Sequence, residues 1–465
     1  MSSLDVSFIS MHGVRARRTQ PPMAPVPSVV QTLAFWRDPH AYLEWCRHRY
    51  GDTFAIDPVG KPPLVFLSRS SDIQTVVKAP ADILHPGAGG VVIAPLVGAG
   101  SFMIAEEDEH LAGRRNILPA FHQRFINEHA HIVRETAERE TTTWPSATPI
   151  ALHGQLRALT LRVILLSIFE HEDRRVRELH ARLLAMFAVT GGLALQERQL
   201  RRLPRWRCIW KRFLADRLEV DQIITDLIRR EAHARSRDSG VLAMLLGSQH
   251  FEESDKGIEQ IRDTLMSLIL AGHETTAAEL AWAFQLLAHN PAVMRRLVDD
   301  LDDGGERYLT AVIHEVLRHR PVFLFTIPRA VRQAFEVSAT TYHPPSHLVG
   351  CVHLMHHDPD LYPEPHTFKP ERFLQAAPNP EIWMPWGGGR KRCPGHRLAL
   401  LEMRVVLDAV LSRFEVAPAR RRLETARWRS VIVTPGDGCR VVLRRRAVAR
   451  QADRALLGDS RRGHS

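Results

Sequence analysis

The sequence predicts a mainly α-helical (α+β) fold: a large helical domain with a long central helix and small β-sheets at one side. Helical periodicity dominates the chain between residues 109 and 319. One helical pattern runs without a break over residues 257–289, far beyond the roughly three turns of an average helix. Strand-like segments are short and lie outside this helical region, which predicts small sheets rather than one large one.

Composition predicts a soluble globular protein, because 45% of the 465 residues are hydrophobic and 25% are charged. No Gly/Ser linker or internal repeat divides the middle of the chain. We therefore expect one domain over residues 28–446, a flexible Pro-rich segment at 1–27 and a basic, disordered tail at 447–465. The five cysteines are scattered and odd in number, which argues against a disulfide framework and favours a reducing, cytoplasmic location.

Several classes of protein are excluded by what the sequence lacks. The net charge of +10 fits a solvated surface and a basic tail. Because no recognisable nucleic-acid-binding motif accompanies the basic residues, we expect no nucleic-acid partner. Residues 1–27 contain no apolar signal-peptide core, so no membrane anchor is expected. Residues 87–105 are uncharged, but five glycines and Pro95 predict a loop rather than a membrane span. Met103 stands where a dinucleotide fingerprint would need its third glycine.

The first half of the chain is expected to begin with a helix at residues 39–50 and two strands of a small sheet at 54–56 and 64–67. Helical spacing of apolar residues then predicts a series of helices. Their expected ranges are 109–118, 127–142, 154–169, 176–188 and 210–236.

The second half is built on the long helix at 257–289, which Ser254 can cap and which Asn290-Pro291 closes. A helix at 308–319 is ended by Pro321. Further strands are expected at 335–338, 347–351, 431–433 and 440–443, the last two pairing across the turn at 435–438.

A glycine-rich loop, Trp386-Gly-Gly-Gly-Arg-Lys-Arg-Cys393-Pro-Gly395, stands just before an amphipathic helix predicted at 396–414. The thiol therefore precedes a helix N-terminus, where backbone N–H groups and the helix dipole stabilise a thiolate. Glycines let the backbone approach a flat ligand closely. Positive charge from residues 390–392 suits both a thiolate and ligand carboxylates. The alternative is a glycine turn followed by an ordinary buried cysteine.

The middle of the long helix reads Ala271-Gly272-His273-Glu274-Thr275-Thr276. Glycine and two adjacent threonines are unfavourable there, so a functional benefit is expected to offset them. Ala271 and Gly272 would make room for a flat ligand. The Thr275 hydroxyl can bond back to the carbonyl of Ala271 and open the helix. The alternative is a close helix crossing that uses small residues.

Glu315 and Arg318 share one helix face because they are three residues apart, and Arg372 follows some fifty residues later in Pro-Glu-Arg-Phe. Surface pairs of this kind are common and weak, which is the alternative interpretation.

Taken together, these motifs resemble the cytochrome P-450 haem-thiolate monooxygenases of the soluble bacterial type. The family signature is Phe, two residues, Gly, three residues, Cys, one residue, Gly; Trp386, Gly389, Cys393 and Gly395 fill it, with Trp in place of Phe. The family pattern of Ala or Gly, Gly, any residue, acid, Thr, Thr or Ser is matched completely by residues 271–276. The resemblance extends from about residue 38 to residue 443.

The resemblance implies haem b with Cys393 as the ligand to its iron. Glu274 and Thr275 would relay protons to iron-bound oxygen, and Glu315, Arg318 and Arg372 would form a buried structural triad. Residues implied to contact the haem besides Cys393 are His110, Arg114, Ala271, Gly272, Arg329, Trp386, Gly389 and Lys391. Residues implied to line a substrate pocket are Phe102, Met103, Leu268, Ile269, Phe323, Leu324 and Phe325. Lysine at 391 offers a point charge where the family commonly has Arg or His.

The resemblance also implies a reaction and partners. We expect O₂-dependent hydroxylation or epoxidation of a hydrophobic, lipid- or terpenoid-like small molecule, with electrons from NAD(P)H. No flavin- or nicotinamide-binding segment is visible, so we expect a separate reductase and an acidic ferredoxin-type carrier docking at Arg390, Arg392 and Arg397.

Two alternatives stay open at this point: a peroxide-driven or oxidative-coupling enzyme of the same fold, and a non-catalytic haem sensor, which would not need the Glu274-Thr275 pair. The histidines at 353, 356 and 357 are interpreted as scaffold rather than a metal site.

Overall fold

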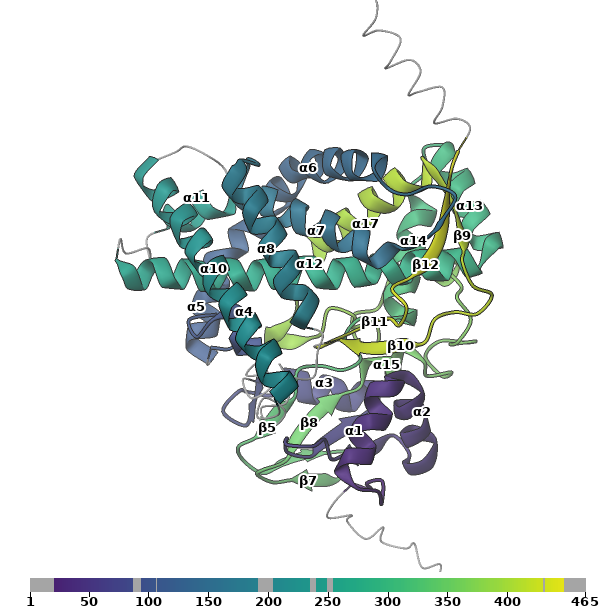
Figure 1. Ribbon diagram of the computed structural model, residues 1–465. Helices are drawn as coiled ribbons and strands as arrows, with labels where there is room; N and C mark the ends of the chain where they lie inside the picture. Colours follow the sequence, from purple (N-terminus) through teal and green to yellow (C-terminus); the bar gives the residue numbers. More distant parts are fainter. Residues whose placement is uncertain are drawn as a thin grey trace, which may run out of the picture.

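The computed structural model describes residues 21–86, 93–105, 107–190, 204–234, 240–248, 254–429 and 431–446. The expected tail at 447–465, most of the segment at 1–27, part of the loop at 87–105 and the end of the helix at 210–236 lie outside these residues. The described part is a largely helical body with small sheets beside it, as expected (Figure 1).

The long central helix is α12, Asp255–His289, which crosses the whole molecule in Figure 1. Its 35 residues correspond to a length of roughly 52 Å at ~1.5 Å per residue. The Ser254 side chain accepts a hydrogen bond of 3.1 Å from the Gly257 N–H, which is the predicted N-cap. At the other end, α13 (Pro291–Asp302) starts with proline, so the chain turns there as expected.

Helix α12 joins two apolar clusters. Its first half, including Leu265 and Ile269, packs with α7 (Leu152–Phe169), α8 (Arg174–Thr190) and α10 (Pro204–Ala234). Its second half, from Ala277 onward, packs with α6, α14 and α17 in a larger cluster. Residues 271–276 supply no apolar side chain to either cluster. The motif singled out from the sequence therefore lies where the two cores meet.

The remaining helices surround α12 and support the sheets. Predicted bounds are reproduced to within a few residues in α2, α5, α6 and α14, whereas α1, α3 and α13 were not expected. Their ranges are α1 Ser28–Arg37, α2 Pro39–Tyr50, α3 Ser70–Lys78, α4 Ala94–Val97, α5 Glu107–Ile117, α6 Gln123–Thr142, α11 Val241–Leu246, α14 Arg307–His319, α15 Val352–His356, α16 Arg372–Gln375 and α17 His396–Leu411.

The largest sheet has five strands in the order β1-β2-β8-β5-β3 and lies beside α1, α2 and α3, below α12 in Figure 1. Strands β2 and β8 are parallel, and the other neighbours are antiparallel. The strands are β1 Thr53–Ile56, β2 Leu64–Leu67, β3 Leu84–His85, β5 Arg329–Val331 and β8 His347–Gly350. A separate hairpin joins β6 (Phe335–Val337) to β7 (Thr340–Tyr342).

The pairing predicted between residues 431–433 and 440–443 is wrong. Strand β11 (Ile432–Pro435) pairs with β10 (Ala426–Arg429). Strand β12 (Arg440–Arg445) instead lies between β4 (Pro149–Ala151) and β9 (Phe414–Pro418). Residues 435–438 do form a turn, but turn chemistry decides only where a chain reverses, not which strand it then meets. Phe414 begins β9, so the predicted helix at 396–414 ends earlier, at Leu411.

Helix α7, Leu152–Phe169, is long and apolar enough to span a membrane by length and composition. However, 61% of it is buried inside the protein, against α12 and α6. This is the pattern of a core helix.

A stack of histidines lies in the core behind α14 and α15. His40 stacks on His353 with 4.3 Å between ring centroids, and His357 lies 4.4 Å from His353 and 5.4 Å from His319. Burial lowers the pKa of all four imidazoles, and they also repel one another when charged. Within the described residues no group of His, Cys, Asp and Glu is arranged to hold a metal ion. The histidine rings pack against one another in this part of the core.

These buried histidines predict acid sensitivity. Burial lowers the pKa of His153 and of His356 to about 3, so both imidazoles are neutral in the folded protein. In the unfolded chain each imidazole regains the ordinary histidine pKa of about 6.5 and takes up a proton as the pH falls through that value. The unfolded state binds more protons as the pH falls, so stability is full above roughly pH 6.5 and declines below it. At pH 5 each of the two is expected to cost about 2 kcal/mol.

The measurement is the thermal unfolding midpoint of the protein at pH 7.5 and pH 5.0. A His153→Asn variant, which cannot take up that proton, should lose less stability between the two pH values than the native chain does. An equal loss in both proteins would contradict the assignment of acid sensitivity to His153.

Candidate functional site

The cysteine loop is closed by backbone hydrogen bonds. The Cys393 N–H donates to the Trp386 carbonyl at 3.0 Å, and a short 3₁₀ turn at Gly389–Lys391 lies between them. Gly389 has a φ of +62°, and a Cβ there would come within 2.1 Å of the Val77 carbonyl oxygen. Only glycine fits both requirements. The loop thus packs against the end of α3. Cys393 lies three residues before the start of α17 at His396.

The expectation that the helix start alone favours a thiolate is corrected by the structure. Burial raises the pKa of the Cys393 thiol, and this effect exceeds the opposing influences. Those influences are a hydrogen bond from the Gly395 backbone and the charges of Arg114 and Arg392. The arrangement supplies partners for a thiolate but does not ionise the thiol by itself. A bound metal ion would, because coordination displaces the thiol proton.

Positive side chains from three elements gather beside the cysteine. The pKa of Lys391 is lowered to about 8, chiefly by burial and also by the charges of Arg329 of β5 and Arg114 of α5, although Glu107 acts in the opposite direction. Arg329 is buried and donates from Nη2 to the Val77 carbonyl at 3.2 Å. Burying several like charges together is costly unless an anion neutralises them. The residues therefore fit the two carboxylates of a haem.

His110 of α5 belongs to the same group. Its Nδ1 lies 2.8 Å from the Phe102 carbonyl oxygen, and burial lowers its pKa, aided by Lys391 and Arg114. Its Nε2 is buried and has no hydrogen-bond partner among the described residues. An orphaned imidazole nitrogen beside two cations suits a ligand carboxylate, as the resemblance implies. The indole Nε1 of Trp386 is likewise buried and unpartnered among the described residues.

The motif of α12 leaves an accessible gap. Ala271 is exposed although residues 265–269 before it and 276–288 after it are buried. The Thr275 hydroxyl donates to the Ala271 carbonyl at 2.6 Å, as predicted. The helix remains continuous through this bond, so the expected opening of its backbone is absent. Ala271 is thus accessible in the middle of an otherwise buried helix, and we call this accessible position the gap at Ala271.

Glu274 has a partner that the sequence did not reveal. Arg157 of α7 donates from Nε to Glu274 Oε2 at 2.8 Å, and both side chains are largely buried. On the same side, the Thr160 hydroxyl donates to the His273 carbonyl at 3.1 Å. The only signal in the sequence was that this Leu-rich helix carries two arginines, Arg157 and Arg162, and nothing in it indicated which of them meets Glu274. The acid of the motif is thus held as an ion pair against α7.

Gly272 lies at the contact between α12 and α7. A Cβ at this position would lie 3.2 Å from Cδ1 of Ile164 on α7. Its missing side chain therefore lets α7 and α12 pack closely. Ala271, with its exposed surface, is the small residue of the motif that faces open space.

The expected pocket residues fall into two groups. Ile269 and Leu324 have no exposed surface and belong to the two apolar cores. Phe325 stacks on Trp428 with 5.7 Å between ring centroids and is part of an aromatic cluster. Phe102 and Leu268 are nearly buried in the apolar cluster that also contains Ile269, Met103 is partly buried, and Phe323 is exposed at 39%.

Glu315, Arg318 and Arg372 come together behind the cysteine loop. Arg318 donates from Nε and Nη2 to the two carboxylate oxygens of Glu315, each at 2.8 Å, and from Nη1 to the His356 carbonyl at 2.8 Å. Arg372 donates from Nε to Glu315 Oε1 at 3.2 Å. Glu315 and Arg318 are completely buried. The bidentate pair connects α14 to α15 through the His356 carbonyl and to the start of α16 through Arg372.

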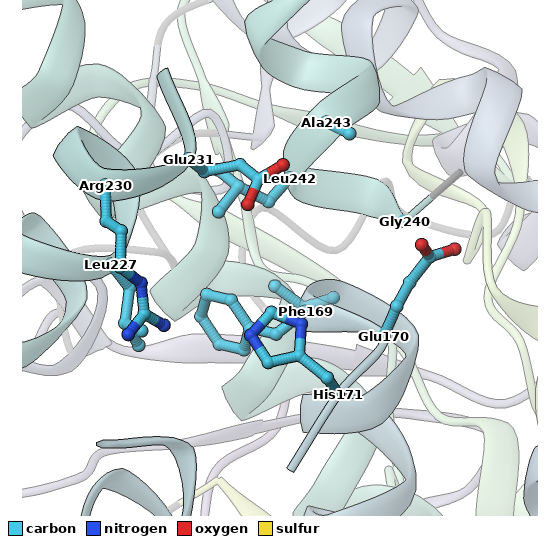
Figure 2. A pocket seen from close by; sticks show the side chains of 10 residues that line it. Phe169, Glu170, His171, Leu227, Arg230, Glu231, Gly240, Leu242 and Ala243 are labelled. Atoms are coloured by element: carbon cyan, nitrogen blue, oxygen red, sulfur yellow. The ribbon is translucent and has the colours of Figure 1, made fainter. Parts of the chain in front are cut away.

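A small recess lies elsewhere, at the C-terminal end of α7. Figure 2 shows it between Phe169, Glu170 and His171 on one side and Leu227, Arg230 and Glu231 of α10 on the other. None of the residues that line it was predicted as a site residue. The candidate site is therefore the region of Cys393 and α12.

Comparison with known proteins agrees with this geometry. The model of the family described as Cytochrome P450 matches residues 20–439. Cytochrome P450 135B1 of Mycobacterium tuberculosis is 31% identical over 441 residues, which cover 91% of each chain. Cytochrome P450 138 of the same organism is 32% identical over 437 residues, covering 92% of this chain and 96% of its own.

Solved structures show the same fold. Retinoic acid-bound cyanobacterial CYP120A1 superposes with a TM-score of 0.78 at 20% identity, covering 92% of this chain and 99% of its own. The haem domain of cytochrome P450DA gives a TM-score of 0.79, also at 20% identity, with coverage of 92% and 98%. The match to the family over most of the chain, and relatives above 30% identity, establish the relationship. The chain belongs to the cytochrome P450 family and is a haem-dependent monooxygenase, which uses O₂, an organic substrate and redox partners.

Proposed function

We propose that this monooxygenase hydroxylates or epoxidises a hydrophobic, lipid- or terpenoid-like substrate in the cytoplasm. The observation that carries the proposal is the gap at Ala271, between the two apolar clusters and next to the proton-bearing pair Glu274-Thr275. Apolar side chains in this part of the molecule include Leu268 of α12 and, from the loop before α5, Phe102 and the partly buried Met103. Apolar walls of this kind favour an apolar ligand.

We assign the haem contacts as follows. Cys393 would hold the iron, and His110, Arg114, Arg329 and Lys391 would hold the two carboxylates. Trp386 and Gly389 shape the loop, and Ala271 leaves space on the opposite helix. When bound, the haem supplies the oxygen activation that side chains cannot perform. The chain contributes orientation, exclusion of water and the supply of protons.

Proton supply is assigned to Glu274 and Thr275. The Thr275 Oγ1 is held at the Ala271 carbonyl, where it borders the gap. The Glu274 carboxylate, which accepts a hydrogen bond from Arg157, is assigned as the group next to Thr275 that passes protons on. A short hydroxyl relay beside the gap then needs no large movement of α12. The pair also favours ordinary O₂ activation over a peroxide-driven enzyme or a sensor.

Thr275→Ala is expected to uncouple the reaction. Reductant should still be consumed, but the product formed per NADPH should fall by about tenfold or more, with peroxide released instead, since general acid–base groups contribute at least ~10²-fold. The measurement is product, peroxide and NADPH in one assay. Thr275→Ser keeps the hydroxyl and should retain coupling. Unchanged coupling in Thr275→Ala would move the relay to another hydroxyl.

The proposed function is tested in two steps. A carbon-monoxide difference spectrum of the reduced protein should show the shifted band of thiolate-ligated haem. A panel of fatty acids, terpenoids and small charged compounds is then screened for the low-spin to high-spin shift. If only the small charged compounds shift the spectrum, the substrate class is wrong. Substrate-dependent NADPH consumption with generic redox partners would exclude a sensor.

Electrons are proposed to come from NAD(P)H through a separate reductase and an acidic ferredoxin-type carrier. Arg390, Arg392 and Arg397 are exposed around Cys393. Arg390 is already paired with Glu107 at 2.9 Å, so Arg392 and Arg397 are the better docking candidates. An acidic partner would be steered toward them by charge.

Reversing both charges, in Arg392→Glu with Arg397→Glu, is expected to slow reduction by the carrier about tenfold or more at low salt. The effect should shrink as salt is added, because screening weakens the attraction. Peroxide-driven turnover should be spared. Arg229→Glu, an exposed site on α10, is the control. Equal losses in the carrier and peroxide assays would mean that the two arginines support the haem site instead.

A further inference from the structure

The loop at residues 98–104 is fastened to α12 by a chain of hydrogen bonds. The Gly100 N–H donates to Oδ2 of Asp263 at 2.9 Å. The hydroxyls of Ser101 and Ser267 lie 2.6 Å apart. Ser267 Oγ donates to the Asp263 carbonyl at 2.6 Å, and the Met103 N–H donates to Ser101 Oγ at 3.2 Å. Each hydroxyl can thus donate once and accept once along one continuous chain, which strengthens every bond in it.

Glycines make this contact possible. Gly98 has a φ of +90°, and a Cβ there would lie 2.2 Å from Cγ of Asp263. On the other side of the loop, a Cβ at Gly113 of α5 would lie 2.4 Å from Cβ of Phe102. His110 adds its contact to the Phe102 carbonyl. The loop is therefore clamped between α12 and α5, with no space for movement toward either.

The Asp263 side chain is fixed in position by contacts on both of its carboxylate oxygens, so it can hold the loop at residues 98–104 against α12. Its side chain is 4% exposed, and its second oxygen accepts a hydrogen bond of 3.0 Å from Nε of Arg262. Arg262 also lies 3.6 Å from Asp221 of α10. A buried carboxylate with a charged partner and a backbone N–H makes charge-assisted bonds, which are stronger than neutral ones. Losing it would leave the Gly100 N–H without its acceptor.

We propose that Asp263 and Ser267 are positioning residues for the substrate. By docking the loop on α12 they hold Phe102 and Met103 beside Leu268, so that the apolar wall is formed before a ligand arrives. A preformed wall avoids the entropy cost of ordering a loop on binding. The assignment rests on the proposed function for its consequence in ligand binding, but the docking itself is independent of haem.

The test compares Asp263→Ala and Gly98→Ala with the native chain by hydrogen exchange and by ligand titration. Exchange of the amides at 98–104 should be about tenfold faster in both variants, as expected for the loss of a charge-assisted bond. Imidazole and the bulky azole clotrimazole are titrated by their haem spectra. Clotrimazole affinity should fall about tenfold, while imidazole, too small to reach the loop, should bind as before.

Matched variants separate docking from general damage. Gly51→Ala has the same kind of strained backbone, with a φ of +87°, but nothing within 4 Å of the new Cβ, so it should change neither readout. Asp263→Asn keeps an oxygen acceptor and should restore most of the docking. Unchanged exchange at 98–104, or an equal loss of affinity for both azoles, would overturn the proposal. Absence of a thiolate-type spectrum in the native protein would instead refute the proposed function and leave the exchange result standing.

Discussion

Cys393→Ala is expected to abolish monooxygenation and the thiolate-type carbon-monoxide spectrum while leaving the chain folded. The loop geometry depends on the backbone bond from the Cys393 N–H to the Trp386 carbonyl and on Gly389, which alanine at 393 leaves intact. The thiol itself is the one group lost. Product formation should fall below detection, which corresponds to at least about 10³-fold, or ~4 kcal/mol of the barrier.

The measurement combines turnover, the difference spectrum and circular dichroism. Cys208→Ala, at an exposed position of α10, controls for the loss of a thiol and should behave like the native chain. Cys393→His offers a nitrogen donor and should give a spectrum without the thiolate band. Full turnover with an unchanged band in Cys393→Ala would refute the assignment of the ligand.

Arg318→Leu is expected to destabilise the fold severely, by about 3–5 kcal/mol, because it leaves the Glu315 carboxylate buried without its bidentate partner. This is a large loss, because the free energy of unfolding of a typical domain is only about 5–15 kcal/mol. The same change also removes the hydrogen bond to the His356 carbonyl, which ties α14 to α15. Low soluble yield and a much lower unfolding midpoint are the expected results.

Arg124→Ala is the matched control, since Arg124 pairs with Glu128 at 2.9 Å but its side chain is 91% exposed. Its loss should cost no more than about 0.5 kcal/mol. Arg372→Leu is expected to lower the free energy of unfolding by an amount between those of Arg124→Ala and Arg318→Leu, because Arg372 is less completely buried than Arg318. A native-like unfolding midpoint in Arg318→Leu would show that the pair does not stabilise the core.

Local patterns predicted the helices well where the apolar spacing was long and uninterrupted. The Ser254 cap, the end of α12 at Asn290 and the exact range of α2 follow from side chains within a few residues of each boundary. Prediction failed for β11 and β12, whose partners are β10 and β9. Strand pairing depends on segments far apart in the chain, and turn residues carry no information about them.

Within the proposed site, the motif spacings alone were enough to propose Cys393, Glu274 and Thr275, because each motif lies on a single loop or helix. The residues on other elements that contact these motifs could not be predicted from motif spacing. Arg157 meets Glu274 across 117 residues, and Asp263 meets Gly100 across 163. Such contacts arise only when α7, α12 and the loop before α5 pack together. The role of Gly272 and the burial of Ile269 and Leu324 were decided in the same way, by which neighbouring helix covered each residue. Candidate functional residues that lie together on one local segment can therefore be predicted from the sequence. The residues that orient their side chains are determined by tertiary packing, because they come from segments far apart in the chain.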